Sequence, residues 1–133
     1  MARPKAILLV DEDNATLKFV TRILENEGFR VTTAQDGGDA LDKVQQAPPD
    51  LVLSEILLPH KNGYQVCRAI KEDKVLSTLP VVFLSAKNQT SDRFWAKRVG
   101  ADGFVAKPFD PADLLREIRS LLRNRTKKQL VKS

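Results

Sequence analysis

The stretch "DLVLSEILLP", residues 50–59, decides the fold because it sets one acidic residue inside a dense apolar run. Leu51, Val52 and Leu53 are typical of a strand that is covered on both faces. A carboxylate buried among apolar groups without a partner is costly, so Glu55 does not belong in a closed core. We expect Glu55 at the end of a strand, where the chain reaches a polar site.

Outward from this stretch, short apolar segments alternate with segments of helical periodicity. The expected strands are 6–10, 29–34, 50–55, 80–86 and 103–106. The expected helices are 14–28, 37–47, 64–72, 91–99 and a last helix after 110. This alternation predicts an α/β fold, a doubly wound five-stranded parallel sheet with helices on both faces.

In such sheets, chemistry gathers at the carboxyl ends of the strands. The first strand ends in Asp11 and Glu12, the third in Glu55, the fourth in Ser85, and the fifth runs into Lys107. The sequence therefore predicts a pocket where three carboxylates, a hydroxyl and an ammonium converge.

The net charge of +5 is concentrated at the C-terminal end. Residues 123–133 hold five of the 22 Lys and Arg and no acid, which leaves 17 basic residues against 17 acidic ones in residues 1–122. We expect 1–122 to be one domain and 123–133 a basic tail. A solvated helix end or linker is favoured over a nucleic-acid arm, since no aromatic residue is interleaved with the charges.

Cysteine content and hydropathy point to a cytoplasmic protein. The single cysteine, Cys67, excludes an internal disulfide and is expected to be a small buried apolar group. No apolar run approaches the roughly 20 residues that a membrane span needs. His60, the only histidine, is expected in an exposed loop.

The motifs at the strand ends resemble the receiver domain of bacterial response regulators, of the CheY-like type, from about Lys5 to Leu122. "LLVDED" (8–13) is similar to the family's acidic pair, and "LPHKNG" (58–63) to the loop after the phosphoacceptor. "VVFLSA" (81–86) and "GFVAKPF" (103–109) are similar to the motifs around the fourth and fifth strands.

The resemblance implies a flavodoxin-like (βα)5 fold with strand order 2-1-3-4-5, and it implies roles for individual residues. Ser85 would be the switch hydroxyl, Phe104 the switch aromatic and Lys107 the invariant lysine. Pro108 would follow a cis peptide bond.

The resemblance also implies a Mg²⁺ ion held by Asp11, Glu12, residue 55 and the carbonyl of Leu57. Mg²⁺ demands a near-octahedral shell at about 2.1 Å, which a longer side chain at position 55 disturbs. A weakened site and an absent one, with Lys107 alone balancing the carboxylates, are about equally expected. No organic cofactor is implied.

Glu55 is the main departure, because the family has a phosphorylatable aspartate at this position. The extra methylene moves the carboxylate outward by about one C–C bond. Three interpretations follow: a built-in mimic of the phosphorylated state that reaches Lys107, a pseudo-receiver locked in one state, or a receiver still phosphorylated, which includes an engineered Asp-to-Glu change. Geometry favours the first two, since misplacement by about 1 Å can cost 100-fold in reactivity.

The implied output is protein–protein contact and not substrate turnover. The partners would be a sensor histidine kinase or chemotaxis-type protein and a downstream target. The face of the fourth helix, fifth strand and fifth helix would bind partners or form a homodimer, with candidates Trp95, Lys97, Arg98 and Phe104. Trp95 is also similar to the tryptophan of PilH-like receivers of twitching motility, although packing between helix and sheet is the more expected role for it.

Two rival functions are weaker. A small flavodoxin-like or nucleotide-dependent enzyme is disfavoured because "QDGGDA" (35–40) lacks the spaced glycines of a phosphate cradle. A bound flavin absorbance would revive it. A DNA-associated regulator acting through the basic tail would give a strongly salt-dependent gel shift.

Overall fold

The computed structural model describes residues 3–132, with side chains through residue 125. Five strands form one parallel sheet in the order β2-β1-β3-β4-β5, which confirms the predicted fold. The strands are β1 (Ala6–Val10), β2 (Arg30–Ala34), β3 (Leu51–Ser54), β4 (Val81–Ser85) and β5 (Gly103–Ala106). Each strand lies within one or two residues of its predicted bounds.

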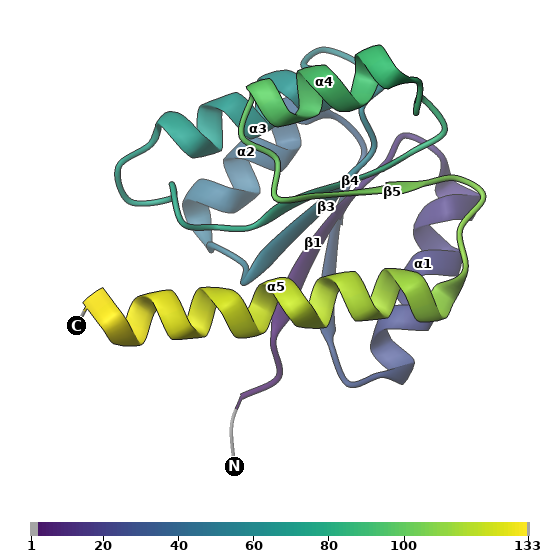
Figure 1. Cartoon of the computed structure of the whole chain (residues 1–133). Helices are drawn as coiled ribbons and strands as arrows, with labels where there is room; N and C mark the ends of the chain where they lie inside the picture. Colours follow the sequence, from purple (N-terminus) through teal and green to yellow (C-terminus); the bar gives the residue numbers. More distant parts are fainter. Residues whose placement is uncertain (1–2, 133) are drawn as a thin grey trace.

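Helices cover both faces of the sheet (Figure 1). They are α1 (Asn14–Asn26), α2 (Gly37–Gln46), α3 (Gly63–Glu72), α4 (Thr90–Arg98) and α5 (Pro111–Lys132). One core cluster joins α2, α3 and α4 to the sheet, and a second joins α1 and α5 to the other face. No helix in the described part of the chain is long and apolar enough to cross a membrane.

Local side-chain caps determine where the helices that flank the site begin. The Asp13 carboxylate accepts a hydrogen bond from the Thr16 backbone N–H at 3.0 Å, which caps α1. Asn62 and Gln65 form a reciprocal capping box at the start of α3. Helix α1 therefore begins shortly after the acidic end of β1, whereas a loop separates Glu55 from the start of α3.

Helix α5 runs without interruption through Leu122 to Lys132. No backbone break marks the predicted boundary between a domain ending at 122 and a tail of 123–133. The Arg125 guanidinium donates to the Asp50 carbonyl at 3.2 Å, which fastens this part of α5 to the start of β3. The side chains of Lys127, Lys128 and Lys132 lie outside the described residues.

Strand β2 is an edge of the sheet and pairs only with β1 in the described structure. The Lys43 ammonium donates to the Thr33 carbonyl at 2.5 Å and lies 3.1 Å from the Asp39 carboxylate. A charged side chain thus occupies a backbone acceptor on the open side of this strand.

Candidate functional site

The ends of β1, β3 and β5 bring Asp11, Glu55 and Lys107 together. The Lys107 Nζ lies 2.8 Å from Asp11 Oδ2 and 3.1 Å from Glu55 Oε1, so one ammonium bridges two carboxylates. This follows from the parallel topology, which places the carboxyl ends of these strands at one edge of the sheet. Glu55 therefore opens into a polar pocket.

Each of the carboxylate oxygens of Asp11 and Glu55 accepts a hydrogen bond. Asp11 is almost fully buried, and its Oδ1 accepts from the backbone N–H of Asp13 at 2.9 Å. The second oxygen of Glu55, Oε2, accepts from the backbone N–H of Ile56 at 2.6 Å. The Glu55 side chain is thus held between its own loop and Lys107.

The charge state of Lys107 is set by competing effects. Burial disfavours the ammonium, but the hydrogen bonds and negative charges of Asp11 and Glu55 outweigh it and raise the pKa of Lys107 above its usual value. Lys107 is therefore cationic at neutral pH and supplies the positive charge of the pocket.

The other strand-end residues lie around this centre without joining the ion pair. Ser85 is fully buried, and its hydroxyl accepts a hydrogen bond from the Lys87 backbone N–H at 3.0 Å. Within the described residues, Ser85 and Glu55 share no hydrogen bond. The Glu12 carboxylate is exposed and has no hydrogen bond in the same part of the chain. The Lys107–Pro108 peptide bond is cis.

Asp11 and Glu55 are arranged around Lys107. Among the side chains described, no group of three or more His, Cys, Asp or Glu is placed to hold a metal ion. Asp11 and Glu55 are both turned toward Lys107, and Leu57 is 62% exposed.

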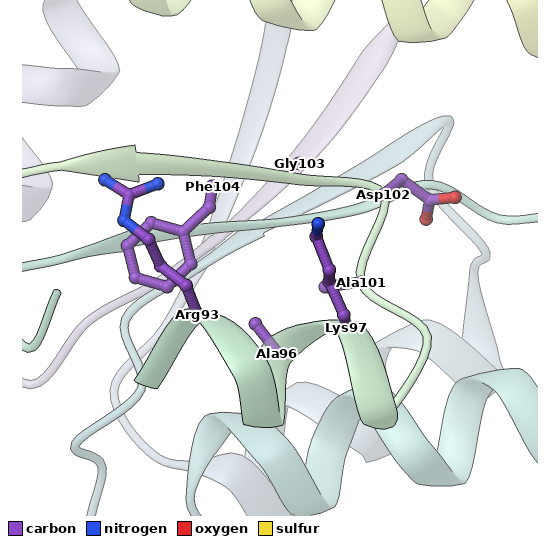
Figure 2. A pocket seen from close by; sticks show the side chains of 7 residues that line it. All are labelled: Arg93, Ala96, Lys97, Ala101, Asp102, Gly103 and Phe104. Atoms are coloured by element: carbon purple, nitrogen blue, oxygen red, sulfur yellow. The ribbon is translucent and has the colours of Figure 1, made fainter. Parts of the chain in front are cut away.

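Phe104 lies in a pocket of about 270 Å³ between α4 and β5. Figure 2 shows Arg93 and Lys97 of α4 lining this pocket together with Phe104. The Arg93 guanidinium lies 4.6 Å from the centre of the Phe104 ring, a cation–π contact. Phe104 also contacts Phe83 edge to face, with ring centres 6.3 Å apart.

Trp95 lies on the other side of α4, and the expectation that it packs between helix and sheet is wrong. It is 50% exposed and lines a groove between α3 and α4. Ala96, the next residue along the helix, is buried instead. The candidates Trp95 and Phe104 therefore line separate pockets.

Residues that the sequence reasoning missed include Asp92, Arg93 and Arg68. Asp92 is buried and paired with the Lys87 ammonium, and it accepts from the Gln89 backbone N–H at 2.9 Å. An acidic residue three positions after a helix-capping residue is a signal that could have identified it.

Cys67 is a buried apolar group, as predicted. Its thiol is fully buried, and burial raises the pKa of Cys67 to about 12. The thiol is thus protonated and unreactive at neutral pH. His60 is exposed in the loop before α3, with a φ of 67°.

A family model described as the response regulator receiver domain matches residues 7–119. The chain is 37% identical to the protein PilH of Pseudomonas aeruginosa, covering 87% of this chain and 96% of PilH. It is 41% identical to the response regulator Rre1 of Synechocystis, covering 92% of this chain and 53% of Rre1. The DNA-binding response regulator MtrA of Mycolicibacterium smegmatis is also 41% identical, with coverage of 88% and 50%. The chain thus spans about half the length of Rre1 and MtrA.

Solved receiver structures are similar to this chain in fold, and the similarity covers nearly their whole length. A CheY-like response regulator receiver domain protein from Methanospirillum hungatei superimposes with a TM-score of 0.88 at 30% identity, covering 94% of this chain and 98% of that one. The chemotaxis protein CheY4 of Vibrio cholerae gives a TM-score of 0.83 at 29% identity, with coverage of 89% and 98%.

Proposed function

Because the chain belongs to the response regulator receiver domain family, we propose that it is a receiver whose signalling output does not depend on phosphorylation. It is a receiver domain of two-component signalling, and such domains are signalling modules and not classical enzymes. Response regulators interact with histidine kinases and with downstream targets. Glu55 stands at the strand end where relatives of this family carry the phosphoacceptor aspartate.

The observation that carries the proposal is the bridge from Lys107 to Asp11 and Glu55. Glu55 has the same charge as the family's aspartate, but its extra methylene carries that charge outward, toward the place of a transferred phosphoryl group, and holds it against Lys107. The substitute is partial, since a carboxylate carries about one negative charge and a phosphoryl group nearly two.

Geometry also argues against phosphoryl transfer to Glu55. Attack on a phosphodonor needs a carboxylate oxygen with a free lone pair aligned with the phosphorus. The longer side chain instead bends back so that Oε2 accepts from Ile56 N–H, while Oε1 faces Lys107. These two contacts hold the carboxylate in an orientation set by Ile56 and Lys107.

Of the two phosphorylation-independent forms, the contacts favour a mimic that works through Lys107. Glu55 touches the lysine, which supports a mimic, but it shares no hydrogen bond with Ser85 in the described structure. The proposed mimic therefore fixes the lysine and leaves the hydroxyl unengaged. Receiver domains generally bind Mg²⁺ at the phosphorylation site; in this chain we propose that Lys107 balances the charge and Mg²⁺ binding is weak or absent.

Incubation with acetyl phosphate and Mg²⁺, read by intact mass, tests the proposal on this protein and on Glu55→Asp. In the aspartate variant a carboxylate oxygen attacks phosphorus, the bond to the acetyl oxygen breaks, and acetate leaves. We expect the added mass of one phosphoryl group on Glu55→Asp and none on the unchanged chain. A stable adduct on Glu55 itself would instead establish the third interpretation, a receiver that is still phosphorylated.

The similarity to half of MtrA, whose name describes it as DNA-binding, favours one second candidate: the receiver part of a DNA-associated regulator. A gel shift with duplex DNA separates the two, because binding through the basic end of α5 would weaken steeply as salt rises.

A further inference from the structure

Helix α4 borders two pockets, one toward β5 and one toward α3. The pocket in Figure 2 lies between α4 and β5. On the opposite side of α4, a groove of about 220 Å³ separates it from α3. The groove is lined by Asn62, Tyr64, Gln65, Arg68, Trp95 and Val99.

Two large aromatic side chains stand exposed beside this groove. Phe94 is 55% exposed and Trp95 is 50% exposed, and their rings contact edge to face with centres 5.5 Å apart. Single exposed apolar residues are ordinary, but adjacent ones that form a patch mark interaction surfaces. Aromatic side chains of this size supply much of the binding energy at protein interfaces.

The charged side chains at this face that matter for binding are arginines. Arg68 and Arg98 are exposed and form no ion pair or hydrogen bond in the described part of the chain. No carboxylate lines the groove. The acid of α4, Asp92, is buried and already paired with Lys87. The patch therefore presents two arginines with unused donors next to apolar rings.

We propose that Phe94, Trp95, Arg98 and Arg68, here called the α3–α4 face, dock an acidic segment of a partner protein that also carries apolar side chains. An apolar side chain of the partner enters the groove beside Trp95. Carboxylates of the partner pair with Arg68 and Arg98, whose planar guanidinium groups bind carboxylates with two parallel hydrogen bonds.

A protein segment fits this face better than a nucleic acid does. Specific binding to nucleic acid draws on many phosphate contacts, on the order of 6 to 10, whereas this face has two free arginines. The amide oxygens of Asn62 and Gln65 are used in the capping box of α3, so these side chains offer their NH2 groups as neutral donors at the groove. Such groups suit the backbone of a peptide.

This inference rests on the proposed function, since it assumes that the domain acts by protein contact. Different experiments test the proposed function and the α3–α4 face, so the failure of one can be told from the failure of the other. A phosphoryl adduct on Glu55 would end the claim of phosphorylation independence and leave the α3–α4 face intact. Absence of binding at that face would leave the mass measurements unchanged.

Trp95 is the single tryptophan of the chain, so its fluorescence reports on the α3–α4 face directly. The full chain is titrated with a synthetic helical peptide that carries Glu and Leu, with a second peptide in which every Leu is replaced by Ser, and with a single-stranded oligonucleotide. We expect a saturable blue shift of the Trp95 emission with the first peptide alone, and weaker binding as salt rises. Equal or tighter binding of the oligonucleotide, or no binding of the first peptide, would overturn the proposal.

Variants that retain Trp95 test whether the peptide binds at the α3–α4 face. Arg68→Glu with Arg98→Glu should weaken the first peptide by about tenfold or more, since each reversal replaces an attraction by a repulsion. The matched control is Lys18→Glu with Phe19→Ala on α1, because Phe19 is as exposed as Phe94, at 55%. Far-UV circular dichroism checks the fold of both. Equal affinity in the arginine variant and the control would contradict the proposal.

Discussion

Lys107 is the residue on which the electrostatics of the strand-end pocket depend. Its ammonium is the one cation that touches Asp11 and Glu55 in the described structure, and both carboxylates are largely buried. Two buried carboxylates without a counter-charge repel each other. The Lys107 ammonium therefore offsets the repulsion between these two side chains.

Replacing Lys107 by methionine keeps the length of the side chain and removes the charge. We expect Lys107→Met to lower the free energy of unfolding by about 2 kcal/mol at pH 7, as breaking a partly buried pair does. Urea denaturation measures the loss.

Two further variants give this measurement its control. Arg119→Met breaks the exposed pair with Glu27 and should cost less than about 1 kcal/mol. Adding Glu55→Gln to Lys107→Met should restore part of the lost stability, because one of the facing charges is removed. A double variant no more stable than Lys107→Met would mean that packing, and not charge, explains the loss.

At the scale of elements, the start of α4 is held by a single buried acid. Asp92 accepts hydrogen bonds from the Lys87 ammonium and the Gln89 backbone N–H, and Tyr64 donates to its carbonyl at 3.2 Å. The hydrogen bond from Lys87, and then the one from Gln89, lower the pKa of Asp92 against the opposing effect of its burial. This acid ties the loop after β4 to the helix that carries both α4 pockets.

The lowered pKa of Asp92 gives its contribution a definite pH dependence. A carboxyl whose pKa is lower in the folded state stabilises the fold above its unfolded pKa, near 3.9, and loses this effect as the pH falls below it. We therefore expect Asp92→Asn to be clearly less stable than the unchanged chain at pH 6 and the difference to shrink by pH 3. Urea midpoints across this range measure it, and a difference independent of pH would refute the role of the charge.

The loop from β3 to α3 is packed too closely to accept an added methyl group at Gly63. A Cβ there would lie 2.5 Å from the Glu55 carbonyl oxygen and 2.9 Å from the Ile56 Cα. These are backbone atoms, so the loop that positions Glu55 would have to move.

Gly63→Ala should therefore destabilise the protein by about 1 to 3 kcal/mol, measured by urea or thermal unfolding. Gly38→Ala is the control within a helix start, because its Cβ would approach only the Asp36 side chain, at 3.3 Å. It should change stability by less than about 1 kcal/mol. A Gly63 variant as stable as this control would show that the loop adapts freely.

At the scale of the whole molecule, the sheet could be predicted because every strand is a distinct apolar run between helical segments. The same topology predicted that Asp11, Glu55 and Lys107 converge, since it depends on strand ends and not on side-chain detail. The partners of Ser85 and Asp92 could not be predicted. Both depend on Lys87: its backbone N–H donates to Ser85 and its ammonium pairs with Asp92. Lys87 lies in the loop after β4, where the sequence has no periodic pattern.

The expectation that Trp95 packs between helix and sheet failed for a related reason. Helix α4 has only nine residues, and its buried positions are an acid and an alanine, Asp92 and Ala96. An apolar stripe normally identifies the inner face of a helix. Here the largest apolar side chains, Phe94 and Trp95, are on the outside, so hydrophobicity alone assigns the wrong face.

The hydrogen bond from Lys43 of α2 to the open edge of β2 has a consequence for how the protein behaves at high concentration. An unprotected edge strand is a template on which further chains can polymerise, as in amyloid fibrils. With the Lys43 ammonium already on the Thr33 carbonyl, a second chain would have to displace a charged group before it could add its own strand. This contact therefore disfavours aggregation through the edge of β2, and it does not involve the pocket at the strand ends.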